Sequence, residues 1–96
     1  MFFLVLAADR PGQLERRLEH RHRHLDYWKG RPGAVKVAGA MLDGDNPKGS
    51  AFLIEAVDEA AVRRLIAEDP FTSEGIFDDD IRIEAFRPAI GEWNRA

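Results

Sequence analysis

The residues best suited to chemistry lie in one short segment of the sequence. His20, His22 and His24, the three histidines of the chain, fall within five residues and are interleaved with arginines. A histidine changes its charge near neutral pH, so it can accept or donate a proton during a reaction. On a helix, at about 100° per residue, His20 and His24 lie about 40° apart and His22 points almost opposite. His24 is therefore the candidate acid or base, and His20 and His22 are expected to belong to a charged helix surface.

Arg21 stands three residues before His24 and lies midway between Leu18 and Leu25 in the apolar stripe of the same helix. A charge inside such a stripe is costly unless an anion pairs with it. A guanidinium donates two parallel hydrogen bonds to a carboxylate, so Arg21, together with Arg17, is a candidate for binding an anionic oxygen. The competing interpretation is an ordinary charged surface helix. The expected stripe comprises Leu14, Leu18, Leu25 and Trp28.

Asp69 is the carboxylate that we consider as a partner for His24. It precedes Pro70, which disfavours helical geometry at the residue before it, so Asp69 is expected at a turn where the second helix ends. One interpretation is structural, because Asp at a cap followed by Pro commonly begins a helical turn. The other is that the carboxylate orients a histidine and fixes which ring nitrogen carries the proton. The residues alone leave both interpretations open.

Metal chemistry has little support in the sequence. His20 and His24 have the i, i+4 spacing of a ligand pair, but a zinc site usually needs a third protein ligand, and the chain has no HExxH pattern. The chain has no cysteine, which excludes thiolate ligands and a cysteine nucleophile. The acidic run Asp78–Asp80 lacks calcium-loop spacing and is expected to be a solvated turn before the last strand. We predict neither a metal nor a cofactor.

Six elements must position these side chains. A continuously apolar run at 2–8 predicts a buried strand, and Asp9 is a reasonable cap for the helix that follows. Asp58 caps the second helix, and residues 43–49 are expected to form a loop. The predicted strands lie at 2–8, 34–42, 50–57 and 81–87. The first predicted helix follows the cap Asp9, has Pro11 in its first turn and runs to about residue 28 or 29. The second follows the cap Asp58 and ends near Asp69.

This β-α-β-β-α-β order predicts one α+β domain over residues 1–96, of the ferredoxin-like type, with an antiparallel sheet and both helices on one face. Strand 2–8 is apolar on both of its faces, and strand 50–57 is similar. Helices cover only one face of the sheet. We therefore expect a homodimer in which a second copy packs on the other face.

Composition limits the classes of partner. The net charge is −3, from 14 basic and 17 acidic residues, which argues against binding of nucleic acid. The opening apolar run is too short to span a membrane. The absence of disulfides in so small a chain favours the cytoplasm.

Several of these residues together resemble the YciI-like family, also called the YCII-related domain. The resemblance implies a ferredoxin-like α+β barrel formed by a dimer, with His24 and Asp69 paired in the active site. It also implies that Arg21 lines the pocket of this site, and that a relative performs dehydrochlorinase-type elimination on a chlorinated aromatic compound. Arg17 and Ser50 are the other candidate substrate-binding residues. The chain departs from the family pattern at Ala40, where proline is frequent. The matching stretches are Asp9…Leu14-Glu15-Arg16-Arg17-Leu18…Arg21…His24-Leu25, Ala38-Gly39, Gly49 and Asp69-Pro70-Phe71.

The sequence therefore predicts a small acid–base enzyme that acts by elimination or isomerisation on a small polar or aromatic molecule. His24 would transfer the proton, Asp69 would orient the imidazole, and Arg21 and Arg17 would hold an anionic oxygen. The alternative is a non-catalytic module that binds an anionic metabolite with the same side chains.

Overall fold

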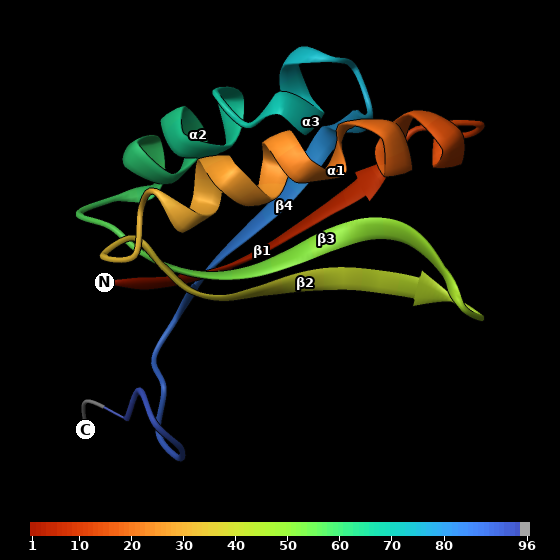
Figure 1. Cartoon of the computed structure of the whole chain (residues 1–96). Helices are drawn as coiled ribbons and strands as arrows, with labels where there is room; N and C mark the ends of the chain where they lie inside the picture. The colour runs from red at the N-terminus through yellow and green to blue at the C-terminus, as the bar shows by residue number, and fades with distance from the viewer. Residues whose placement is uncertain (95–96) are drawn as a thin grey trace.

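The computed structural model describes residues 1–94 as four strands and three helices. The sheet has the order β2-β3-β1-β4, and every neighbouring pair is antiparallel. All three helices lie on one face of this sheet (Figure 1). The predicted α+β, ferredoxin-like fold is confirmed. The elements are β1 Phe2–Asp9, α1 Leu14–Lys29, β2 Val35–Asp43, β3 Asn46–Glu55, α2 Glu59–Ala67, α3 Pro70–Ser73 and β4 Phe77–Phe86.

Two predicted strand boundaries were wrong. β3 begins at Asn46, so the expected loop at 43–49 is only a tight hairpin turn around Gly44, whose φ is +59°. Glycine adopts such an angle without steric cost, and this lets the two strands pair almost to the turn. β4 begins at Phe77, so the acidic run Asp78–Asp80 belongs to the strand. The Arg10 guanidinium donates a hydrogen bond to Asp79 over 2.7 Å and helps hold this end of β4 beside β1.

The core lies between the helices and the sheet. On β1, Phe3, Val5 and Ala7 face the helices and are buried, whereas Leu4 and Leu6 on the opposite face are each 39% exposed. The strand is thus apolar on both faces, as its sequence indicates, and the single chain covers the second face only in part, at Phe2 and at Leu53 of β3. After β4 the chain turns away from the sheet on the side opposite the helices (Figure 1). Within the described residues, no helix is long and apolar enough to cross a membrane.

The buried face of α1 differs from the predicted apolar stripe. Leu18 is 56% exposed, and the buried residues of the helix are Arg17, His24 and Trp28. Arg21, predicted to lie within the stripe, is exposed. The helix is rotated toward the side on which Arg17 and His24 find polar partners on neighbouring elements. A hydropathy pattern cannot detect such partners, because they come from distant parts of the chain.

Candidate functional site

Asp69 occupies the junction between α2 and α3. It is the N-cap of α3, with extended backbone angles (φ −63°, ψ 131°), and Pro70 takes the first helical position. The Phe71 backbone N–H donates to Asp69 Oδ1 over 2.9 Å, which is the capping bond expected for this motif. The capping carboxylate is 0% exposed. The structural interpretation of Asp69 is therefore correct, but it describes only part of what the residue does.

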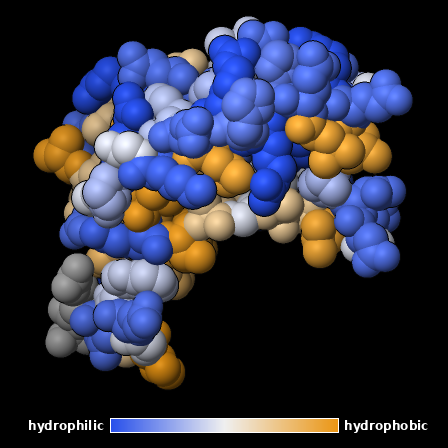
Figure 2. All heavy atoms as spheres, viewed as in Figure 1, coloured by the Kyte–Doolittle hydropathy of each residue, from blue (hydrophilic) through white to orange (hydrophobic). Residues whose placement is uncertain are grey.

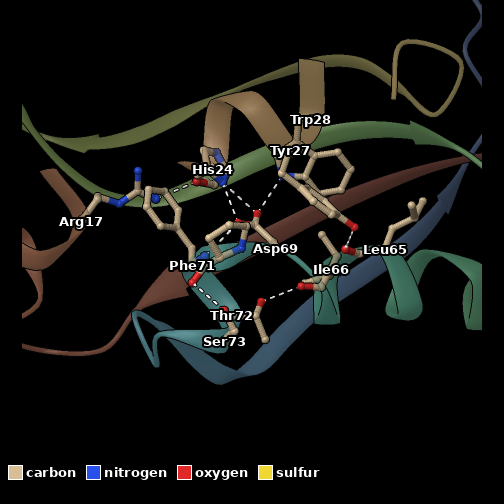
Figure 3. Close-up of polar contacts among 12 residues, drawn as sticks. Arg17, His24, Tyr27, Trp28, Leu65, Ile66, Asp69, Phe71, Thr72 and Ser73 are labelled. Carbon is tan, nitrogen blue, oxygen red and sulfur yellow. Dashed lines mark hydrogen bonds and ion pairs between the residues drawn. The ribbon is translucent and has the colours of Figure 1, made fainter. Parts of the chain in front are cut away.

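The same carboxylate contacts two side chains of α1. His24 Nδ1 lies 2.9 Å from Asp69 Oδ1 and 2.8 Å from Oδ2. Trp28 Nε1 donates to Oδ2 over 2.7 Å. Figure 3 shows the three side chains converging from α1 and from the turn before α3. The structure thus brings together the two residues that the sequence analysis considered as partners.

This contact determines the tautomer of the imidazole. A carboxylate oxygen only accepts hydrogen bonds, so Nδ1 carries the proton that points toward Asp69. In the neutral ring, the lone pair is then at Nε2, on the ring edge away from the carboxylate. Among residues 1–94, Nε2 has no hydrogen-bond partner, and it is not one of the fully enclosed side-chain atoms. The His24 side chain is 8% exposed, so a buried base presents one reactive nitrogen through a small opening.

Aromatic rings hold the imidazole in place. The Phe71 ring stacks on His24 at a centroid distance of 4.1 Å and an interplanar angle of 10°. Phe52 of β3 and Phe77 of β4 contact the ring edge-on, at 6.2 and 6.4 Å. These apolar contacts restrict rotation of the ring and limit access of water to it. The base is therefore fixed in position before any ligand binds.

A second polar group adjoins the first across the Phe71 ring. The Arg17 guanidinium carbon lies 4.5 Å from the Phe71 ring centroid, and Figure 3 shows this ring between Arg17 and His24. Arg17 Nε donates to Asp9 Oδ2 over 2.7 Å, and Nη2 donates to Ser50 Oγ over 2.6 Å. Two bonds leave further N–H groups of Arg17 available to bind an anionic oxygen. Asp9 Oδ1 is enclosed and without a hydrogen bond in the described structure.

Gly49 allows β1 and β3 to approach closely just before Ser50. A Cβ atom at this position would lie 2.6 Å from the Ala7 carbonyl oxygen and 2.6 Å from the end of the Met41 side chain. The first of these is backbone and cannot move aside easily. Glycine at this position therefore fixes the place of Ser50 relative to β1 and to Arg17.

Two features of the site differ from the prediction. Asp9 does not cap α1, whose N-cap is Gln13; instead it forms a buried ion pair with Arg17. Arg21 does not lie in a buried stripe: it is exposed at the side of the helix and bonds to neither of the two polar groups. The remaining histidines lie elsewhere: His22 is exposed, and His20 lies 3.7 Å from Glu74. In residues 1–94, no cluster of three or more histidine, aspartate or glutamate side chains is arranged to hold a metal ion.

Comparison with known proteins identifies the family of the chain. The sequence profile of the YCII-related domain matches residues 1–87. The chain belongs to the YCII-related domain family. An uncharacterised protein of Haemophilus influenzae is 28% identical over 90 residues, which cover 84% of this chain and 92% of that protein.

Solved structures show the same fold. The chain is similar to 5-chloro-2-hydroxyhydroquinone dehydrochlorinase (TftG) from Burkholderia phenoliruptrix AC1100, whose structure contains 2,5-dihydroxybenzoquinone. The TM-score is 0.81 at 29% identity, over 91% of this chain and 94% of the other. A conserved protein from Methanosarcina mazei Go1 shares only the fold, with a TM-score of 0.51 at 19% identity, 86% of this chain and 87% of that chain being covered.

Proposed function

We propose that this YCII-related protein is a small acid–base enzyme that catalyses an elimination or a related proton shift on a small polar or aromatic molecule. The observation that carries the proposal is the His24 imidazole, bound through Nδ1 to the buried Asp69 while Nε2 is free. A histidine oriented by a carboxylate is the usual arrangement of a general base. The similarity to a dehydrochlorinase supports the same class of reaction.

The proposed steps assign one task to each side chain. In an elimination, His24 Nε2 accepts a proton from the substrate, the electron pair of that bond forms the new double bond, and the leaving group departs with its own pair. Asp69 holds the ring and stabilises the imidazolium that forms. Arg17, positioned by Asp9, and the Ser50 hydroxyl stabilise the negative charge that develops on a substrate oxygen.

The rival proposal is a non-catalytic protein that binds an anionic metabolite at the same place. It is favoured by the buried Arg17 guanidinium, which retains free N–H groups on the other side of the Phe71 ring from His24. The two proposals differ in what the His24–Asp69 pair, called the dyad below, must do. A binding protein needs only a site whose charge and shape fit the metabolite. An enzyme also needs the lone pair at His24 Nε2 to accept a proton.

His24→Gln and Asp69→Asn separate the two proposals. In an enzyme, either substitution is expected to lower turnover by about 10²–10⁴-fold while the substrate still binds. The assay would follow loss of chloride or a change in absorbance with chlorinated hydroxyhydroquinones, the class named for the dehydrochlorinase relative. If 2,5-dihydroxybenzoquinone binds and neither variant reduces turnover of any such compound, the enzyme proposal is wrong.

We also propose that the protein acts as a cytoplasmic homodimer. The support is the apolar sheet face away from the helices, where Leu4, Leu6, Val37 and Phe86 are between 39% and 52% exposed. A patch of this kind on a small domain commonly marks a protein interface. Sedimentation of the wild-type chain and of Leu6→Glu at micromolar concentration tests this: the wild type should be a dimer and the variant a monomer. A monomeric wild type would contradict the proposal.

A further inference from the structure

The helix-facing side of the sheet is covered at β3 but open at β2. Trp28 of α1 packs on Phe52 of β3, with ring centroids 4.9 Å apart. Ala38 and Ala40 on β2, which pair with Phe52 and Ser50, are exposed. Residues directly opposite each other in antiparallel strands project to the same face. Because Phe52 and Ser50 contact α1, Ala38 and Ala40 also project to the helix side, beside the candidate site.

Arg21 lies on the side of α1 that faces this open strand. At about 100° per residue, Arg21 stands about 60° from His24 on one side of the helix, and Tyr27 stands about 60° away on the other. The Tyr27 hydroxyl donates to the Leu65 carbonyl of α2, so that side faces α2. Arg21 therefore projects in the opposite direction, toward β2. Within the described part of the chain, the Arg21 guanidinium has no hydrogen bond and no ion pair.

These residues define what we call the β2 shelf: Ala38 and Ala40 form its floor, and Arg21 lies on the side of α1 that faces them. Figure 2 views the molecule from the same direction as Figure 1 and shows hydrophobic and neutral atoms in a band beneath the hydrophilic surface of α1. Methyl groups on the floor leave room for a flat molecule. The shelf adjoins Ser50, and through Ser50 it adjoins Arg17.

We propose that the β2 shelf binds the non-reacting part of the substrate and that Ala40 limits the size of the substrate that fits there. This proposal rests on the proposed function and extends it. The other sides of His24 are occupied by Asp69, Phe71 and the rings of the sheet, so the uncovered strand is the route to Nε2. The substrate class is a flat, anionic small molecule, with its carboxylate or phenolate toward Arg21. A larger side chain at position 40 would fill the space beside Ser50.

Chemical access to His24 tests the route without a known substrate. Diethyl pyrocarbonate acylates neutral imidazole nitrogens, and mass spectrometry of the digested protein gives the rate at each histidine. His22 is exposed and serves as the internal reference. Ala40→Leu is expected to slow acylation of His24 relative to His22, and Ala38→Leu is expected to do the same. Ala60→Leu, at an exposed position of α2, should leave the ratio unchanged.

Ligand binding tests the size limit and the role of Arg21. The probe is 2,5-dihydroxybenzoquinone, titrated against the whole protein. Ala40→Leu should weaken its binding at least about tenfold, the effect expected when a pocket loses space for one or more carbon atoms. Arg21→Gln should weaken binding of this anionic probe but leave the acylation ratio of His24 unchanged, because Arg21 binds the ligand and does not block the route.

The outcomes distinguish this proposal from the proposed function. An unchanged acylation ratio in both Ala40→Leu and Ala38→Leu would overturn the shelf, and Ala40→Val replaces the leucine variant if the latter unfolds. If these variants changed the sedimentation of the protein but not the ratio of His24 to His22 acylation, the shelf would be an interface with a second copy of the chain. That result would also overturn the proposal. If the dyad variants keep full turnover while Ala40→Leu still blocks acylation, the proposed function fails and the shelf stands.

Discussion

Asp69→Asn is the substitution that most directly tests the buried polar network. Three donors converge on the two carboxylate oxygens of Asp69: His24 Nδ1, Trp28 Nε1 and the Phe71 backbone N–H. An asparagine side chain keeps one accepting oxygen and places an N–H₂ group, which is a donor, at the other position. Whichever way the amide is turned, at least one buried donor then faces another donor.

The magnitude follows from these contacts. One buried donor without an acceptor costs about 1–3 kcal/mol, and the hydrogen bond of His24 also loses its charge assistance, which roughly halves its strength. Together these effects should lower the free energy of unfolding by about 2–4 kcal/mol. The burial of Asp69, at 0% exposed, means that water cannot replace the missing acceptor.

Urea unfolding followed by tryptophan fluorescence measures this loss, at one fixed protomer concentration because association would shift the apparent stability. Asp58→Asn is the matched control. Asp58 caps α2 by accepting from the Ala61 N–H over 2.8 Å, and asparagine caps a helix equally well. The control should therefore change stability by less than about 0.5 kcal/mol.

The reasoning would be refuted if Asp69→Asn were no more destabilising than Asp58→Asn. A double-mutant cycle with His24→Gln adds a second criterion. Residues that share a buried hydrogen bond show coupling of about 0.5–3 kcal/mol, whereas distant residues are additive within about 0.5 kcal/mol. Additive losses for His24 and Asp69 would mean that the contact is absent in solution.

Two further predictions concern neighbouring groups. Arg17→Lys should reduce both stability, by about 1–3 kcal/mol, and turnover, because one ammonium cannot replace the two directed bonds to Asp9 and Ser50; urea unfolding and steady-state kinetics measure the two effects. Burial raises the pKa of Tyr27, so folding favours the protonated phenol, and the stability that this contributes is present below the ordinary pKa of about 10 and lost as the pH rises through the folded pKa. Tyr27→Phe should therefore flatten the fall in unfolding free energy above about pH 10, and an unchanged slope would contradict this assignment.

The strand and helix order could be predicted because each element carries a local signal. The apolar run at 2–8, the caps at Asp58 and Asp69, and Pro70 each dictate the backbone within a few residues. The hairpin was mispredicted because Pro47 and Gly49 suggest a loop, yet Pro47 pairs with Leu42 beside a bulge. Proline is tolerated at such an irregular position in a sheet, and the sequence does not reveal the bulge.

The site was predictable only in part. His24 and Asp69 stood out by their residue types, but their contact depends on how α1 packs against the α2–α3 junction. Asp9 was assigned to a helix cap because a cap is the local use of an aspartate before a proline. Its pairing with Arg17 was knowable only from the rotation of α1, which also exposes Arg21.

The buried polar groups of the core favour the proposed functional role of the His24–Asp69 pair over a merely structural one. Four polar residues are buried in this chain of 96 residues: Arg17, His24, Ser50 and Asp69. The core of so small a chain gives only a small free energy of unfolding. Apolar side chains of similar volume would commonly be as stable or more stable in such positions. A histidine that served only to satisfy Asp69 could have its other nitrogen bonded to the protein. His24 instead has no hydrogen bond at Nε2, and Arg17, on the other side of the Phe71 ring, keeps N–H groups that Asp9 and Ser50 do not use. A base and an anion-binding group are what proton transfer from an oxygen-bearing substrate requires, which favours the proposed role.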